Sequence, residues 1–227
     1  MAKAHFTPAL FDFLRELTDN NERTWFEANK KRYEKDVREP MLAFITDFAP
    51  RLSGLTPHCI ASAKKVGGSM FRPNRDVRFS NDKSPYKTHC GAHFTHIRAK
   101  DVHAPGFYLG LEVDKVMVGT GIWQPDTPSL AKIRDAIVAD PKDWELCISG
   151  DFAKNFEVRG ERLKNAPKGY DKAHPLVETL KLKDFVGYRN LTEADACKAS
   201  FIDDYTALCR AAVPFNRFLR RSLGLEF

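Results

Sequence analysis

Apolar positions recur every three to four residues near both ends of the chain, and this spacing predicts helices there. Thr7 and Pro8 form a natural cap and first turn, after which apolar residues continue at helical spacing. A second helix is expected from residue 22, with a break or kink at Pro40. Residues 50–57 are expected to form a loop, because proline stands at both ends of this stretch.

The middle of the chain has a different pattern, in which apolar and polar residues alternate as they do in strands. Two of the expected strands flank Asp114-Lys115 and should form a hairpin. A capped helix is expected to follow Asp126, and a short helix should run through Trp144. Residues 159–175 are expected to be mostly loop. The expected strands cover residues 70–79, 88–97, 107–113, 116–123 and 183–191, and a last helix is capped by Ser200 and bent by Pro214.

Helices therefore come first, then a cluster of strands, then helices again, without β-α-β alternation. This order predicts an α+β fold, with a mainly antiparallel β-sheet packed against N-terminal and C-terminal helices. We expect one domain over residues 1–227. It would consist of a helical segment (1–58), a β-rich segment (62–124) and a helical C-terminal part (126–227) with one returning strand.

Composition narrows the class of protein. Of the 227 residues, 43% are hydrophobic and 29% are charged, which is typical of an ordinary globular chain. There is no apolar run of the ~18–20 residues that a membrane-spanning helix needs, and no signal peptide at the start. The five cysteines are dispersed, which favours reduced thiols. We therefore expect a cytoplasmic protein that has no contact with membranes.

The positive charge is concentrated in one part of the chain. The net charge is +6, yet residues 62–100 hold nine cations and two carboxylates, so the rest of the chain is close to neutral. A local positive field attracts anions such as phosphate, nucleotides or nucleic acid. Within this part, residues 71–89 read F-R-P-N-R-D-V-R-F-S-N-D-K-S-P-Y-K-T-H.

If residues 70–79 are extended, Phe71, Val77 and Phe79 line one face of the strand, and Asp76 can orient Arg78 on the other face. Arg75 falls on the apolar side, where an unpaired charge is costly. It must then be buried and paired, with Asp82 as the candidate partner, or be turned outward by an irregularity at Pro73.

We interpret this run as a site for an anionic, phosphorylated or carboxylated, small molecule, and leave open whether the site is catalytic. Arginine offers a planar pair of donors and lysine a mobile charge, whereas a carboxylate or tyrosine can orient groups or move a proton. The expected anion-binding residues are Arg72, Arg75, Arg78, Lys83 and Lys87; the candidates for catalysis are Asp76, Asp82 and Tyr86; and the pocket wall is assigned to His89 and Trp123.

No cofactor and no metal are expected. In an extended segment, His89 and His93 would lie about 13 Å apart, too far to share one ion. His93 and His96 would point to opposite faces of the strand. The glycines around residue 120 lack the spacing of a dinucleotide-binding fingerprint and are expected to allow close packing.

The pattern F-R-x-x-R-D-x-R-F-S-x-D-K-x-P-Y-K-T-H resembles the signature of a family of bacterial and fungal proteins catalogued as a domain of unknown function (number 2461). The resemblance continues along most of the chain, with a small departure at Pro73-Asn74. The resemblance implies no activity, cofactor or catalytic residue. Further matching segments are N-N-x-R-x-W-F (20–26), A-P-G-F-Y-L (104–109), G-x-W-x-P-D (121–126), I-R-x-A-I (133–137) and G-x-x-L-K-x-A-P-x-G-Y-D (160–171).

Two alternatives to the small-molecule site stay open. A nucleic-acid-binding module would use the same cations, with aromatic side chains stacking on bases. A structural or protein-interaction domain would use the charged run as an internal ion-pair network. The oligomeric state is not determined by the sequence. The cations that would extend a nucleic-acid surface are Lys64, Lys65, Arg98 and Lys100.

Overall fold

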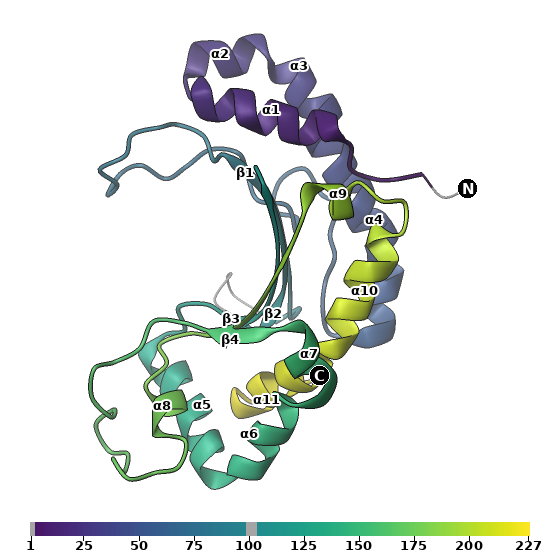
Figure 1. The fold of residues 1–227 in the computed structure, drawn as a ribbon. Coiled ribbons are helices and arrows are strands. Elements are labelled where there is room, and N and C mark those ends of the chain that lie inside the picture. The colour runs from purple at the N-terminus through teal and green to yellow at the C-terminus, as the bar shows by residue number, and fades with distance from the viewer. Residues whose placement is uncertain (1–2, 99–103) are drawn as a thin grey trace.

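A computed structural model describes residues 3–98 and 104–227. Five antiparallel strands form one curved sheet in the middle of the molecule (Figure 1), in the order β1-β2-β3-β5-β4. Together with the helices at both ends of the chain, this sheet confirms the predicted α+β class. The strands are β1 (His89–Thr95), β2 (Gly106–Glu112), β3 (Lys115–Ile122), β4 (Glu157–Arg159) and β5 (Phe185–Leu191).

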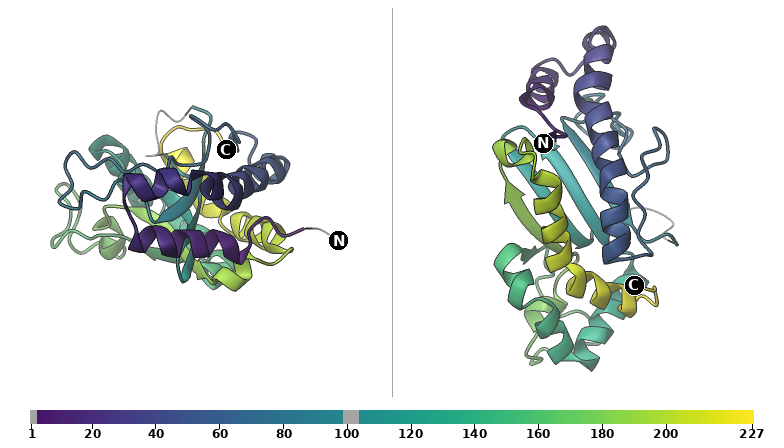
Figure 2. Two further views of the ribbon diagram at one scale, coloured as in Figure 1. Left: turned by 90° about the horizontal axis from the view of Figure 1, so that it is seen from above. Right: turned by 90° about the vertical axis from the view of Figure 1, so that its right-hand side faces the viewer.

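Helices cover one face of the sheet, and further helices lie at the two opposite ends of the molecule. Helices α4 and α10 lie side by side across the convex face (Figure 2), whereas α5 and α6 lie at the opposite end of the molecule from α1–α3 (Figure 1). Among the described residues, no helix is both long enough and apolar enough to span a bilayer. The helices are α1 (Pro8–Asp19), α2 (Arg23–Ala28), α3 (Lys30–Arg32), the π-helix η1 (Tyr33–Arg38), α4 (Glu39–Leu55), α5 (Thr127–Ala139), α6 (Pro141–Cys147), α7 (Gly150–Asn155), α8 (Val177–Leu180), α9 (Glu193–Ala196), α10 (Phe201–Ala211) and α11 (Val213–Ser222).

The two faces of the sheet carry different residues because side chains alternate along each strand. On the convex face, large apolar side chains such as Phe94, Phe107 and Leu109 are fully buried under the helices. Phe94 contacts Phe48 of α4 and Tyr205 of α10, with ring centroids 4.9 and 6.3 Å apart. The concave face is not covered in this way, and it is there that the candidate site lies.

Two expectations about helices were wrong. Residues 50–57 do not begin a loop, since α4 continues through Pro50 to Leu55. Burial explains this: Phe48 and Leu52 are both fully buried on either side of the proline, which offsets the backbone hydrogen bond that it removes. Pro214 does not bend one long helix but stands in the first turn of α11, where its missing N–H has no helical partner to lose. Pro40 stands in the first turn of α4, directly after the π-helix η1, so the helix type changes where a break or kink was expected.

Four of the five predicted strands are present, and the exception is residues 70–79. This segment forms only isolated bridges, Met70 to Ala92 and Asn74 to Tyr86, because Pro73 lacks an N–H for a continuous ladder. Phe79, expected on the apolar face, is 95% exposed, since the chain has left the sheet at that point. The C-terminal part contributes two strands, β4 and β5, instead of one.

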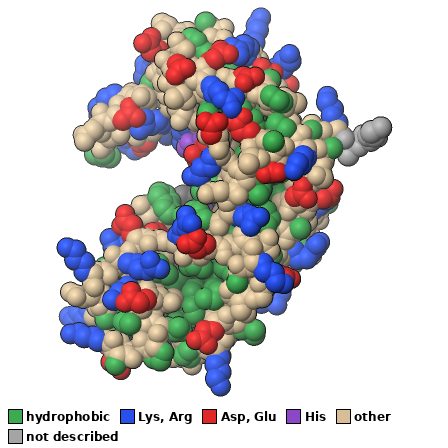
Figure 3. All heavy atoms as spheres, in the orientation of Figure 1, with side chains coloured by type: hydrophobic (Ala, Val, Ile, Leu, Met, Phe, Trp, Pro, Cys, Tyr) green, Lys and Arg blue, Asp and Glu red, His purple; other side chains and the backbone are tan. Residues whose placement is uncertain are grey.

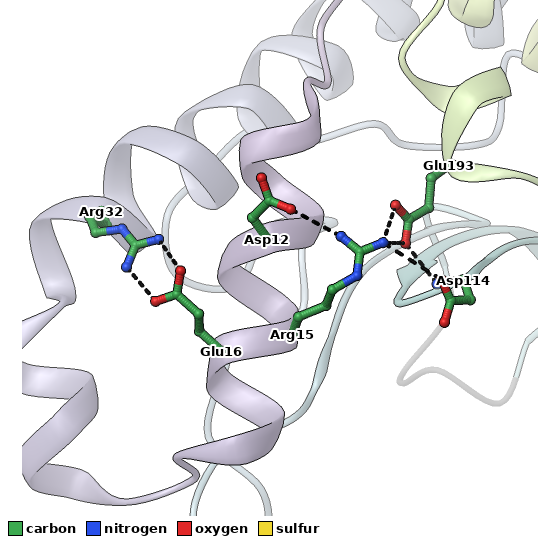
Figure 4. Close-up of polar contacts among 6 residues, drawn as sticks. All are labelled: Asp12, Arg15, Glu16, Arg32, Asp114 and Glu193. Carbon is green, nitrogen blue, oxygen red and sulfur yellow. Dashed lines mark hydrogen bonds and ion pairs between the residues drawn. The ribbon is translucent and has the colours of Figure 1, made fainter.

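Ion pairs join the N-terminal helices to the tip of the β2–β3 hairpin (Figure 4). Arg15 of α1 donates two hydrogen bonds of 2.6 Å to Glu193 of α9, and Glu193 in turn accepts from the backbone N–H of Asp114 at 2.7 Å. Arg32 pairs with Glu16 through two bonds of 2.7 and 2.9 Å. These contacts fix one end of the sheet against α1 and α9.

Candidate functional site

A cavity of about 470 Å³ lies on the concave face of the sheet, and we call it the sheet cavity. Figure 3 shows the molecule hollowed on this side, between the region of α1–α3 and that of α5–α8. Aromatic side chains dominate the lining, namely Phe71, Tyr108, Trp123 and Tyr188. The structure places both residues of the predicted pocket wall, His89 and Trp123, in this lining.

Glycines make room for the sheet cavity. The strand register sets Gly91 opposite Gly110, and Gly119 opposite both Tyr108 and Tyr188. A Cβ atom at Gly91 would lie 2.7 Å from the Tyr108 hydroxyl, and one at Gly110 would lie 2.8 Å from the same ring. The Tyr108 ring therefore lies flat on the sheet, which only glycine at these two positions allows.

Three basic side chains line the same cavity: Lys87, His89 and His93. The Lys87 ammonium lies 4.9 Å from the centroid of the Phe71 ring. Burial lowers the pKa of Lys87, with the charge of Arg72 as a smaller cause. Burial also lowers the pKa of His89 below its ordinary value, although the carboxylate of Glu112 acts in the opposite direction. Burial therefore disfavours the charged form of both side chains, and Lys87, the stronger base of the two, is the cation that an anionic group can pair with.

The charged run forms an irregular hairpin, residues 73–87, which we call the motif hairpin. The backbone N–H of Arg75 donates to Pro85 at 2.9 Å, and that of Lys87 donates to Pro73 at 2.8 Å. Its base is attached to the edge of β1, where Phe71 donates to Gly91 at 2.9 Å. This attachment explains why the first and last parts of the signature, with Phe71, Lys87 and His89, reach the sheet cavity while the middle does not.

The carboxylates of the motif hairpin neutralise two of its arginines. Asp76 accepts from Arg78 at 2.9 and 2.7 Å, as the alternation of the sequence predicted. Arg75 is partly buried and pairs with Asp82, which was the first of the two predicted arrangements. The hydrogen bonds from Arg78 lower the pKa of Asp76 to about 2, and those from Ser84 and then Arg75 lower the pKa of Asp82. Carboxylates with such lowered pKa values are weak bases.

The five predicted anion-binding residues do not meet in one place. Lys87 belongs to the sheet cavity, whereas Arg75 and Lys83 line a separate hollow of about 370 Å³ beside Asn21 and Arg23. The Lys83 ammonium donates to the Val77 carbonyl at 3.0 Å. Arg78 is paired and largely exposed, and Arg72 is exposed.

Tyr86 lines neither of these hollows and is packed in the hydrophobic core instead. It is only 5% exposed, and its ring stacks on Phe26 at a centroid distance of 4.0 Å. The side chain of Asn21 accepts from its N–H and donates to its carbonyl, both at 3.0 Å. Two segments of the signature that are far apart in sequence, residues 20–26 and 71–89, thus come together here, and they fasten the motif hairpin to the helices.

Tyr108 and Tyr188 were not assigned to the site from the sequence, nor were the glycines that make room for the cavity. The sequence does contain a signal for them, because Gly106, Tyr108 and Gly110 stand at every second position of one strand and so share a face, as do Gly119 and Gly121 on the next strand.

Within the described residues, no three His, Cys, Asp or Glu side chains are grouped so as to hold a metal ion.

Comparison with protein families gives one match, which covers most of the chain. The model of a family described as "Conserved hypothetical protein (DUF2461)" matches residues 9–218. A comparison with curated proteins finds no match.

Proposed function

Because the chain belongs to the DUF2461 family, whose description names no activity, we propose its function from the geometry of the sheet cavity. The cavity binds a small organic molecule that has an aromatic or otherwise flat apolar body and one anionic group. The body lies on Tyr108 and against Trp123, and the anionic group pairs with Lys87. This keeps the predicted class of ligand, an anionic small molecule, and moves its site from the motif hairpin to the sheet.

Size and lining support this proposal. A volume of about 470 Å³ lies within the range of roughly 300–1,000 Å³ that is usual for small-molecule sites. Such sites combine apolar walls with a few polar groups that fix the orientation of the ligand. Here the aromatic rings provide stacking area, and the polar groups gather where residues 87–89 enter the sheet.

The observation that carries the proposal is the position of Lys87. Its ammonium is partly desolvated against an aromatic ring inside the cavity, where burial disfavours its charge. An anionic ligand would reverse this penalty and would form a charge-assisted hydrogen bond in apolar surroundings. The arginines of the motif hairpin have less to offer, since Asp76 and Asp82 already pair with two of them.

The same pairing weakens the nucleic-acid alternative, which needs a broad surface of cations that are not neutralised. Arg98 also faces a carboxylate, that of Glu226 at 3.4 Å. Lys64 and Lys65 are exposed, and Lys100 lies outside the described residues.

Fluorescence titration with anilinonaphthalene sulfonate, an aromatic anion that becomes bright in apolar surroundings, tests the proposal. We expect one saturable site per chain. Lys87→Met should weaken binding about tenfold, since it removes one charge-assisted hydrogen bond. Lys83→Met is the matched control: it removes a lysine of the same motif that lies outside the cavity, and it should leave the affinity unchanged.

A second variant blocks the cavity without touching its charge. A Cβ atom at Gly119 would meet the side chain of Tyr108, whose nearest atom is its Cβ at 3.3 Å, so Gly119→Leu should fold and fill the space above the sheet. We expect it to abolish binding while a cooperative thermal transition is kept. Equal affinity in wild type, Lys87→Met and Gly119→Leu would refute the proposal, and a loss in Lys83→Met alone would move the site to the motif hairpin.

A further inference from the structure

A second hollow, of about 730 Å³, lies next to the sheet cavity, between α5 and the segments around residues 160 and 184. Trp123 and Tyr188 line both spaces, so the two are neighbours that share a wall. We call this space the Arg134 hollow, after the arginine of α5 that lines it. Helix α5, labelled in Figure 1, contributes Leu130 and Arg134 to its lining, and Arg134 lies in the I-R-x-A-I segment that matches the family.

Arg134 is a buried cation. Its residue is only 8% exposed, its Nη2 donates to the Leu182 carbonyl at 2.9 Å, and its Nε has no hydrogen-bond partner. Among the residues that the structure describes, no carboxylate lies within 4.0 Å of its guanidinium. Burial lowers the pKa of Arg134, and the nearby Tyr170 acts in the opposite direction.

The two other cations of the hollow are already paired with carboxylates. Lys183 pairs with Glu161 at 3.0 Å, and Arg159 pairs with Glu157. Asp184 lines the hollow too, but its carboxylate accepts from the backbone N–H of Gln124 at 2.5 Å. Among the described residues, Arg134 is thus the one cation of this lining that is buried and has no carboxylate within 4.0 Å.

A buried guanidinium without a counter-ion is costly, and proteins normally balance it with an anion. We infer that the Arg134 hollow is a binding site for a carboxylate group, separate from the sheet cavity and from the function proposed for it. A planar guanidinium and a planar carboxylate match in shape, since the N–H donors that Arg134 does not spend on Leu182 can face one oxygen pair. A dianionic phosphate fits less well, because the carboxylate of Asp184 lines the same space and repels a dianion more strongly than a monoanion.

Propionate tests this inference, because it carries a carboxylate and lacks the aromatic body that the sheet cavity would bind. At constant ionic strength, we expect propionate to raise the melting temperature in a saturable way and to shift the Nε–H resonance of Arg134. Inorganic phosphate should do so at least several-fold more weakly. Arg134→Met should weaken propionate binding roughly tenfold to a hundredfold, the loss of a charge-assisted hydrogen bond.

Two controls separate a binding role from a structural one. Arg159→Met removes a paired cation from the rim of the same hollow and should keep the response to propionate. Arg134→Lys keeps the positive charge but loses the planar set of N–H donors of the guanidinium. This variant should fold and should bind propionate several-fold more weakly than wild type. Arg134→Met without propionate should be about as stable as wild type, since it replaces an unbalanced buried charge by an apolar side chain.

The inference is overturned if propionate gives no saturable response in wild type, or an equal response in Arg134→Met. It is also overturned if Arg134→Met is strongly destabilised and propionate never shifts the Arg134 resonance, because Arg134 would then serve as a donor to Leu182 alone. Lys87→Met should leave the propionate response intact, so failure of this inference and failure of the proposed function give different results.

Discussion

Asn21 should be a larger determinant of stability than its neighbour Asn20, although both are polar residues at the end of α1. The side chain of Asn21 makes two hydrogen bonds of 3.0 Å with the backbone of Tyr86, whose ring is buried against Phe26. Asn20 makes one side-chain bond, of 2.9 Å, to Glu16 in an exposed position. Removing the side chain of Asn21 therefore leaves two groups of a buried residue without partners.

The magnitude follows from these contacts. At about 0.5–1.5 kcal/mol for each hydrogen bond, with an added penalty for unsatisfied groups, Asn21→Ala should lower the free energy of unfolding by about 2 kcal/mol. Asn20→Ala should cost about 0.5 kcal/mol, because water replaces its single bond. For a chain of this size, the larger change lowers the melting temperature by about 4–8 °C.

Urea unfolding of wild type and both variants measures this difference, provided that the dependence on urea concentration is the same in all three. Hydrogen exchange of the Tyr86 amide gives a local check and should speed up in Asn21→Ala alone. Equal destabilisation by the two substitutions, or unchanged exchange at Tyr86, would show that the motif hairpin is not held by Asn21.

Two further predictions concern backbone and pH. Gly121 has a φ of 111°, and a Cβ atom there would lie 2.1 Å from the Phe185 carbonyl oxygen, so Gly121→Ala should cost about 3 kcal/mol or more in urea unfolding. Gly150→Ala, at a φ of 56° with nothing within 4 Å, should cost only about 1 kcal/mol, and equal losses would contradict the argument. Because the pKa of Asp76 is lowered from 3.8 to about 2, its pairing with Arg78 should be complete above pH 4 and lost as the pH falls through about 2. The carboxyl carbon resonance of Asp76 measures this directly, and Arg78→Met should return its midpoint toward 3.8.

The regular elements could be predicted because burial and local signals agree in them. Strands β2 and β3 are mainly apolar runs on the two sides of the turn at Asp114, and α5 is capped by Asp126, whose side chain accepts from the N–H of Ser129 at 2.8 Å. The prediction failed where tertiary contacts decided between local signals. Pro50 is a local helix breaker, but the buried side chain of Leu52 keeps α4 helical beyond it.

The site was harder to predict than the fold. Parity along the chain was enough to pair Asp76 with Arg78 and to single out Arg75 for Asp82, since these contacts are local. It could not show that the end of the run, at Lys87, enters a cavity whose other walls come from β2, β3 and β5. That cavity depends on strand register, which sets Gly91 opposite Gly110 and so lets Tyr108 lie flat.

The central claim is that a ligand binds on the concave face of the sheet and not among the arginines of the motif hairpin. Nuclear Overhauser effects between bound anilinonaphthalene sulfonate and the protein locate the ligand directly. We predict contacts from its aromatic protons to the rings of Tyr108 and Trp123, and to the side-chain methylene groups of Lys87. Contacts to Val77 and Phe79 of the motif hairpin, with none to Tyr108, would contradict the account.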